Sequence, residues 1–537
     1  MKLNYKKIFY VGLAFLLVSM FWQTYDSIIT KILIDKFGLN QTWSGLVMAL
    51  DNILALFLIP LFGSLSDKAN TKRGRRTPFI IVGTVIAAFA FMALTFSDNV
   101  QKSKINTQSE IINNYNTIYE SDEDLSYSEW NSIYLQVESE WLELKNNEII
   151  SIEKYNEYEN DIILPMEEIL EDDIVSDEEV NELKILFDLH ANKRAWVVTS
   201  RSPSTFIVFV VTLLIALLSM ATFRSPAVAL MPDVTIKPLR SKANAIINLM
   251  GSFGALISLG ILMIFGLDRL SYVDYTPAFI AVGIMMIVLL IIFLIKVKEP
   301  ELVAEKVAKE VKYNLEIDEV EIEEVKPEKL PEEKLSKEKR LSLILILVSV
   351  SLWFMGYNAV TTKLSDYAPK VLEIGYGIPI YIAHGAALIA FVPIGIIATK
   401  IGRRKIILMG IVLLTLCFGS VYFLTKDTAF LMYLIFGLTG IGWATINVNS
   451  YPMVVELAKG SNVGKYTGYY YTFSMGAQII TPIFSGFLMD QFGRIALFPY
   501  ATVFVAMAFV TMFLVKHGDA KIEKKGSLIE NFDVDMD

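Results

Sequence analysis

The stretch LDNILALFLIPLFGSLSDKANTKRGRRTPFIIVGTVIAAFAFMALTF (residues 50–96) contains two long apolar runs separated by a short loop rich in Lys and Arg. A helix needs ~20 mostly apolar residues to cross a bilayer core of ~30 Å, and both runs meet that length. Short loops rich in basic residues stay on the cytoplasmic side of a membrane. This stretch therefore predicts two membrane-spanning helices joined by a cytoplasmic loop.

The rest of the chain repeats this pattern. Its 537 residues are 54% hydrophobic and only 20% charged, which is too apolar for a soluble protein of this length. Membrane-spanning helices are expected near residues 8–34, 43–65, 77–97, 204–231, 243–266, 276–297, 341–362, 376–398, 404–424, 428–451, 464–488 and 494–516. The predicted fold is an all-α polytopic membrane protein with twelve transmembrane helices in two six-helix bundles.

Charged residues outside these segments predict the orientation. Lys and Arg precede the first predicted helix and fill the loops after the second, fourth and eighth, which lie on one side if the helices alternate. Both termini are then cytoplasmic. Between Gln101 and His190, by contrast, there are 24 acidic and 5 basic residues, a net charge of −19, although the whole chain carries −9. This acidic insert would lie outside the cell, and its apolar spacing predicts a small helical module.

These features divide the chain into six segments, two of which form one bundle. The expected parts are an N-terminal bundle (1–97 and 204–297), the extracellular insert (98–203), a charged cytoplasmic linker (298–340), a C-terminal bundle (341–516) and a cytoplasmic tail (517–537). The two bundles also resemble each other, since ATFRSPAVALMPD (221–233) has a counterpart in ATINVNSYPMVVE (444–456). Repeated halves are how many carriers build a binding site at the middle of the bilayer.

Two acidic residues lie inside predicted membrane helices. Asp26 and Asp51 would lie at a similar depth, and a charge in hydrocarbon costs ~2.5–3.5 kcal/mol, so both need a polar surrounding. Ser19, Gln23, Asp26 and Thr30 recur at helical spacing and form one polar stripe. We predict that Asp26 or Asp51 binds a proton or a substrate hydroxyl in a shared cavity. The alternative is that Asp26 only bonds to a neighbouring helix.

Further polar and aromatic residues are candidates for a substrate site in the same cavity. Sugar hydroxyls need hydrogen-bond donors and acceptors, and sugar C–H faces stack on Trp and Tyr. The candidates are Gln23, Asn52, Arg224, Asn248, Trp353, Tyr357, Asn358, His384, Trp443, Asn447, Tyr471 and Gln478. Alternatively, such side chains hold membrane helices together, and Arg224 extends to the interface instead of pairing with Asp26 or Asp51.

The predicted cytoplasmic loops contain acids as well as bases. Orientation in the membrane explains the Lys and Arg residues but not the acids among them. Acid–base pairs there would latch the two bundles and break when the bundles rock. The candidates for this cytoplasmic gate are Gly63, Asp67, Gly74, Arg75, Arg76, Asp233, Arg240, Glu456, Arg403 and Arg404.

Other chemistry finds no support in the sequence. The three His residues lie far apart and there is one Cys, so no metal site is expected. Neither a phosphate-binding loop nor a catalytic triad is found, and we expect neither an enzyme nor a cofactor beyond a coupling ion. A monomer without nucleic-acid partners is expected.

The loop GSLSDKANTKRGRRTPFI (63–80) resembles the signature between helices 2 and 3 of the major facilitator superfamily. LDNILALFLIPLFGSLSD (50–67), FRSPAVALMPD (223–233) and YTGYYYTFSMGAQIITPIFSGFLMD (466–490) resemble the sucrose-transporter-like branch of the glycoside–pentoside–hexuronide:cation symporters. The resemblance implies the major facilitator fold and alternating access. It also implies symport of a di- or oligosaccharide or glycoside with a proton, or with sodium as in some relatives, across the cell membrane. The charged positions of this sequence that match the family pattern are Asp26, Asp51 and Arg224. The resemblance does not cover the insert.

Two other functions remain open at this point. A carrier with the same fold could export drugs or metabolites, in which case bulky apolar side chains would line the cavity. A membrane sensor could instead use the insert to bind an external ligand.

Overall fold

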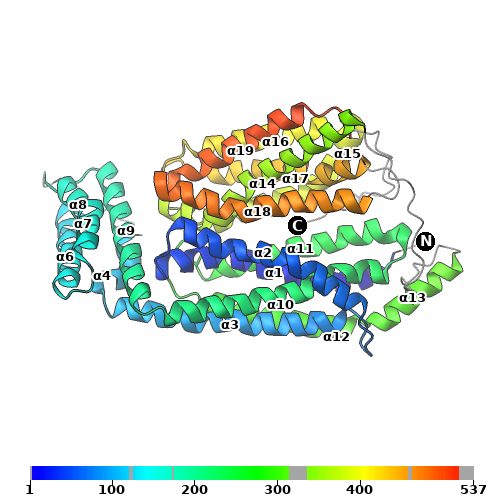
Figure 1. Ribbon diagram of the computed structural model, residues 1–537, viewed down its shortest axis with the longest axis horizontal. Helices are drawn as coiled ribbons and strands as arrows, with labels where there is room; N and C mark the ends of the chain where they lie inside the picture. The colour runs from blue at the N-terminus through cyan, green and yellow to red at the C-terminus, as the bar shows by residue number, and fades with distance from the viewer. Residues whose placement is uncertain (1–2, 120–124, 172–173, 314–335, 458–462, 519–537) are drawn as a thin grey trace.

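The computed structural model describes residues 3–119, 125–171, 174–313, 336–457 and 463–518, and within these ranges the chain is helical without any strand. Two bundles of long helices lie side by side (Figure 1). The N-terminal bundle consists of α1 (Tyr5–Lys31, extended by the π-helical turn η1, Ile32–Lys36), α2 (Gln41–Asp67), α3 (Thr77–Asn106), α10 (Ser204–Val234), α11 (Arg240–Ile264) and α12 (Thr276–Lys296). The C-terminal bundle consists of α14 (Lys337–Val371), α15 (Gly377–Ile401), α16 (Arg403–Val421), α17 (Leu431–Glu456), α18 (Val463–Phe492) and α19 (Leu497–Phe513).

The composition of these helices matches a lipid environment. Over the described residues, eleven helices are long and apolar enough to cross a membrane, and α15 contributes a shorter apolar stretch, Gly377–Phe391. Large apolar side chains on their outer faces, such as Phe57, Phe89 and Ile389, are more than half exposed. Such exposure is costly in water but not in hydrocarbon, where helices also satisfy their own backbone hydrogen bonds. The predicted polytopic fold with two six-helix bundles is confirmed.

Each bundle has its own hydrophobic core, and the bundles meet along a seam. Helix α2 packs against α18, α1 against α14, and α11 against α15. Gly45 of α2 lies against the backbone of Pro482, and Gly486 of α18 lies against the backbone of Gln41. A Cβ atom at either glycine would overlap the opposite helix, so small residues allow the two backbones to approach closely.

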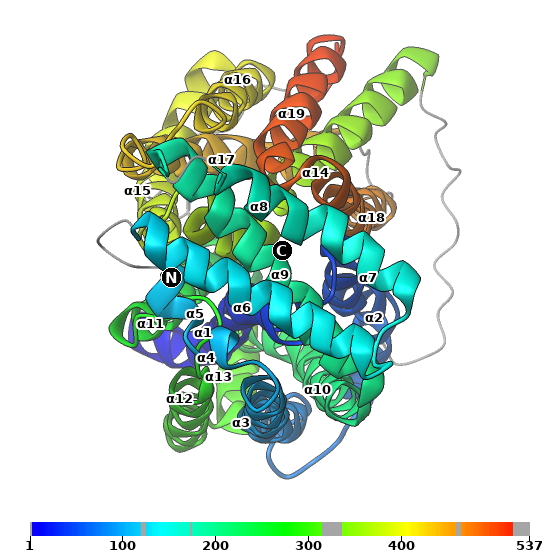
Figure 2. The ribbon, with the colours of Figure 1, turned by 90° about the vertical axis from the view of Figure 1, so that its left-hand side faces the viewer.

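A third unit lies at one end of the bundles, which we call the insert end (Figure 1). It contains α4 (Glu110–Asn113), α5 (Tyr115–Tyr119), α6 (Tyr127–Asn146), α7 (Ile152–Tyr158), η2 (Glu159–Ile163), α8 (Leu164–Ile169) and α9 (Asp177–Arg201). Its separate core includes the fully buried Trp130 and Trp141. Figure 2 looks at this end, with α6 and α8 nearest the viewer.

The insert is continuous with the N-terminal bundle through a shared helix. Helix α3 does not end near residue 97 as predicted but continues to Asn106, so one helix belongs to both units. Lys36 and Asp98 form an ion pair at 2.6 Å in which both side chains are fully buried. At the opposite end, which we call the loop end, α13 (Glu299–Lys312) follows the N-terminal bundle (Figure 1).

Candidate functional site

The charged residues predicted at mid-membrane come together in the N-terminal bundle. Asp26 of α1, Asp51 of α2 and Arg224 of α10 are half-buried, and Asp51 interacts electrostatically with both other side chains. The Asn52 amide also donates a 2.9 Å hydrogen bond to Asp51 Oδ1. Two interacting carboxylates, with one guanidinium near Asp51, carry an excess negative charge when both are ionised, and a bound proton or metal cation would neutralise it.

One end of the polar stripe of α1 contacts the other bundle. Near one end of the stripe the Gln23 amide donates to Ser27 Oγ at 3.2 Å. One turn beyond Asp26, Thr30 donates to the carbonyl oxygen of Thr362 on α14 at 3.3 Å. This contact crosses the seam between the bundles, so the Thr30 end of the stripe lies at the seam.

On the C-terminal side, two of the predicted aromatic residues form a stack. The Tyr357 ring lies parallel to the Trp443 indole, with centroids 3.8 Å apart and an interplanar angle of 8°. Both are half-buried, and Phe354 contacts the indole edge-on. Trp353, in contrast, is fully buried in the core of the C-terminal bundle. Its indole therefore has no exposed surface in this conformation, and a role of Trp353 in substrate binding stays a prediction.

The other substrate candidates of these two bundles are distributed over five helices. Asn358 on α14, His384 on α15, Asn447 on α17, and Tyr471 and Gln478 on α18 are half-buried. Asn248 on α11 is buried, and Ser252 donates to its carbonyl oxygen at 3.3 Å.

Asn358 Nδ2 and Trp22 Nε1 are among the buried donors that have no hydrogen-bond partner within the described residues. Buried polar groups are rarely left unpaired, so each is a candidate for contact with a ligand or water. Trp22 was not predicted from the sequence. It lies one helical turn before Asp26, and the Arg224 guanidinium lies 5.8 Å from its ring centre. Its helical spacing from Asp26 is the sequence signal that could have identified it.

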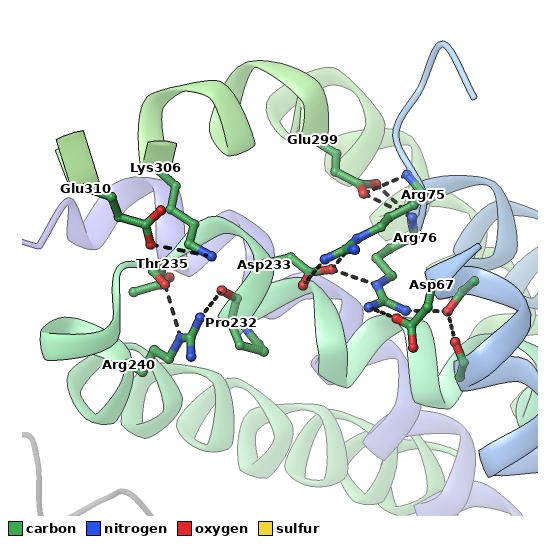
Figure 3. A network of polar contacts seen from close by, with 12 residues as sticks. Asp67, Arg75, Arg76, Pro232, Asp233, Thr235, Arg240, Glu299, Lys306 and Glu310 are labelled. Carbon is green, nitrogen blue, oxygen red and sulfur yellow. Dashed lines mark hydrogen bonds and ion pairs between the residues drawn. The ribbon is translucent and has the colours of Figure 1, made fainter. Parts of the chain in front are cut away.

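At the loop end, Asp233 of α10 joins the two arginines that precede α3 (Figure 3). Arg75 donates to it at 2.6 and 3.1 Å, and Arg76 donates at 2.7 Å. Arg76 also pairs with Asp67 at the end of α2. All of these partners belong to the N-terminal bundle. The prediction that these residues latch the two bundles is therefore wrong for the conformation described, and they instead join α2, α3 and α10.

A further acid, Glu299 of α13, completes this cluster and was missed (Figure 3). Its carboxylate accepts hydrogen bonds from the backbone N–H groups of Arg75, Arg76 and Thr77 at 2.8–3.0 Å, and from Thr77 Oγ1 at 2.7 Å. An anion is favourable at the N-terminus of a helix such as α3. Gly74, with a φ of 105°, lies directly against this carboxylate. The sequence holds no local signal for a contact that spans more than 200 residues.

The remaining gate candidates also make contacts within their own bundle. Arg403 at the start of α16 pairs with Glu456 at the end of α17, and Arg404 donates to the carbonyl oxygen of Phe513. Arg240 donates to the carbonyl oxygens of Thr235 and Pro232 at 3.2 and 3.1 Å, where α10 ends. Gly63 of α2 faces Ser225 of α10, with Oγ 2.9 Å from the position of an added Cβ.

Comparison with known proteins assigns most of the chain. The model of the Major Facilitator Superfamily matches residues 195–387 and 365–527, more than half of the chain, and a model described as "MFS/sugar transport protein" matches residues 10–110. Sucrose transport proteins SUC4 and SUC3 of Arabidopsis thaliana are 30% identical over 73 residues and 31% identical over 83 residues. Those stretches are 14% and 16% of this chain and 14% of each relative, so the matches span a small part of the relatives' length.

Solved structures share the fold over nearly the whole chain. The inward-open xylose transporter XylE from E. coli is 14% identical, with a TM-score of 0.53 and coverage of 98% of this chain and 99% of that one. A bacterial homologue of the iron transporter ferroportin in an inward-facing state is 12% identical, with a TM-score of 0.56 and coverage of 95% and 99%. At such identities the likeness establishes the fold alone.

Proposed function

The chain belongs to the Major Facilitator Superfamily, and we propose that it is a proton-coupled symporter of a di- or oligosaccharide or a glycoside. It is a membrane transporter and not an enzyme. A saccharide substrate is supported by the sugar-transport model at residues 10–110 and by the sucrose transport proteins of Arabidopsis thaliana. The symport mechanism is supported by the D-xylose-proton symporter, which shares the fold with a TM-score of 0.52 at 14% identity over 95% of this chain.

The observation that carries the proposal is the cluster of Asp26, Asp51 and Arg224 beside the seam. Its excess negative charge favours binding of one proton, and neutralisation makes the closed, dehydrated intermediate of a transport cycle less costly. In this scheme Asp26 or Asp51 carries the proton. Arg224 holds the remaining carboxylate or a substrate hydroxyl.

The substrate side of the proposal rests on the facing bundle. The stacked Tyr357 and Trp443 rings provide a flat apolar surface of the kind on which sugar C–H groups pack. The unpaired Asn358 Nδ2 and Trp22 Nε1 are donors available to hydroxyl oxygens. Protonated acid on one bundle and bound sugar on the other would together favour closure, which is how symport couples the two fluxes.

For location, we propose the cell membrane, with the insert end outside and the loop end in the cytoplasm. Lys and Arg gather in the loop between α2 and α3, whereas the insert is strongly acidic. Both termini are then cytoplasmic, and the carrier works as a monomer. Its two bundles would rock about the seam to expose the site to each side in turn.

Uptake of labelled saccharides into proteoliposomes tests the proposal, with a proton gradient, a sodium gradient or no gradient. We expect accumulation only with the proton gradient. Asp26→Asn and Asp51→Asn should each reduce accumulation at least tenfold, because a neutral amide cannot exchange a proton. Counterflow of substrate without a gradient should persist.

Asp427→Asn, which removes an exposed acid in the loop before α17, is the matched control and should behave like the original protein. Normal accumulation by both cluster variants would refute the coupling assignment. Accumulation driven only by the sodium gradient would show that sodium, and not a proton, is the coupling ion.

A further inference from the structure

The insert reaches the C-terminal bundle through a buried carboxylate. Asp188 of α9 is 4% exposed and pairs with Lys370 of α14 at 3.0 Å and with Arg494 of η5 (Arg494–Ala496) at 2.8 Å. The Tyr115 hydroxyl donates to the same carboxylate at 2.7 Å. Burial raises the pKa of Asp188, but the positive charges of Arg494 and Lys370 outweigh burial and hold that pKa below its usual value of 3.8. Asp188 therefore remains ionised in this network.

Lys370 also contacts the N-terminal bundle, and both bases contact Asp366 of α14. Lys370 pairs with Asp35 of η1 and lies 3.3 Å from Asp366. Arg494 donates to Asp366 at 2.9 Å, and Asp366 accepts from the Gln41 amide at 2.6 Å. The insert, α1, α2 and α14 thus share one network of buried charges at the insert end.

A second carboxylate of the C-terminal bundle binds the start of α2. Asp490 of α18 accepts hydrogen bonds from the backbone N–H groups of Gln41 and Thr42 at 2.7 and 2.9 Å. These N–H groups are unpaired within the helix, and the helix N-terminus favours an anion. This contact holds the two bundles together at the insert end without help from the insert.

The insert is covalently continuous with the N-terminal bundle through α3 and α10, and hydrogen bonds reinforce this connection. Asn192 of α9 donates to the carbonyl oxygen of Ile34 at 2.8 Å, and Gln101 of α3 donates to Thr199 of α9 at 2.9 Å. Together with the continuous helix α3, these contacts make α9 move with the N-terminal bundle. Its bonds to the C-terminal bundle therefore cross the boundary along which the bundles move.

Within the described residues, four contacts of the insert cross this boundary. Besides the Asp188 pairs, the Tyr119 hydroxyl donates to the carbonyl oxygen of Lys370 at 3.0 Å, and Lys184 of α9 pairs with Glu373 at 3.4 Å. Lys184 is buried, whereas Glu373 is partly exposed and also pairs with Lys426. In an alternating-access carrier the bundles must separate at this end once in each cycle, so each of these contacts must break.

We propose that the insert is a built-in latch for the insert end, and that Asp188 is its principal gating residue. It stabilises the conformation in which the insert end is closed, and opening requires Lys370 and Arg494 to leave the Asp188 carboxylate. The proposal depends on alternating access and not on the identity of the substrate or coupling ion. A passive insert, which only covers the N-terminal bundle, would leave the conformational equilibrium unchanged.

Thiol labelling measures that equilibrium directly. Cys417 is the only cysteine in the sequence, so Cys417→Ser provides a background without thiols. Thr30 is fully buried and contacts Thr362 across the seam, so a cysteine placed by Thr30→Cys reports opening. The reagent is a membrane-impermeant maleimide, added to right-side-out vesicles or proteoliposomes without substrate or gradient.

We expect Asp188→Asn to speed labelling at position 30 by about tenfold or more, because the closed state loses both ion pairs. Glu373→Gln should speed it about twofold to fivefold, since that pair is partly exposed. The control is Glu182→Gln, which removes an exposed acid from the same helix and should leave the rate unchanged.

Equal labelling rates in all three variants would overturn the latch. If Asp188→Asn fails to fold, Glu373→Gln decides by the same comparison, because Glu373 is partly exposed and Gln keeps an amide oxygen that can accept a hydrogen bond from Lys184. Failure of the latch is separable from failure of the proposed symport, because the labelling requires neither substrate nor proton gradient.

Discussion

Gly74→Ala should destabilise the loop end by displacing Glu299. The backbone at Gly74 has a φ of 105°, where side chains are strained, and an added Cβ would lie 2.7 Å from Glu299 Cγ and closer still to its carboxyl group. Ordinary contact begins near 3.4 Å, so the Glu299 side chain must retreat by at least 0.7 Å. Its hydrogen bonds to the backbone of Arg75 and Thr77, both 2.8 Å long, would then stretch beyond useful length.

The magnitude follows from these contacts. Each hydrogen bond to a charged group contributes ~1.5–3 kcal/mol, but the bonds are not additive and water replaces part of them, so we expect ~2–4 kcal/mol for their joint loss. The strained backbone adds ~1–3 kcal/mol. Gly266→Ala is the matched control, because Gly266 also has a positive φ, 68°, but no atom lies within 4 Å of an added Cβ. Gly266→Ala should lower the free energy of unfolding only by the backbone strain.

The assay is the free energy of unfolding in detergent micelles, measured by denaturant titration for Gly74→Ala, Glu299→Ala and the double variant. If displacement of Glu299 causes the destabilisation, the loss of unfolding free energy on Gly74→Ala should be ~2–4 kcal/mol smaller in the Glu299→Ala background. An equal cost in both backgrounds would refute the reasoning and leave backbone strain as the whole effect.

Two further predictions concern buried charges. Lys36→Met should reduce stability by ~3–5 kcal/mol because it leaves Asp98 charged and fully buried. Adding Asp98→Leu should restore most of the loss, and thermal unfolding of the single and double variants checks this. In the insert, burial lowers the pKa of His190 below 6.5, with Glu140 acting in the opposite direction. The folded insert therefore binds fewer protons than the unfolded one, and its stability should fall as pH drops below 6.5. His190→Gln should reduce this slope, measured by tryptophan fluorescence; an unchanged slope would show that another group titrates.

Part of the candidate site could be predicted from local patterns. The depth of Asp26 and Asp51 within apolar runs, and the helical spacing around Asp26, indicated a polar surface before any fold was known. The pairing of these acids with Arg224 was left open, because helix periodicity gives a face for each residue but not the helix that it faces. Trp353 shows the limit of such reasoning, since an aromatic residue in a membrane helix fits a core and a binding site equally well.

The sequence by itself determined the class of fold and its division into parts. Apolar runs of bilayer length admit only helices, because hydrocarbon offers no partners for backbone polar groups. The charge of the insert and the basic loops likewise follow from composition alone.

Only the tertiary structure decided which charges meet. Glu299 binds the start of α3, the predicted gate acids pair within one bundle, and Asp188 of the insert reaches Lys370 and Arg494 of the C-terminal bundle. The physical reason is range: hydrophobic periodicity acts over neighbouring turns, whereas an ion pair requires two side chains within ~4 Å, whatever their separation in the chain. A local sequence pattern does not show which distant residues come within ion-pair distance of each other.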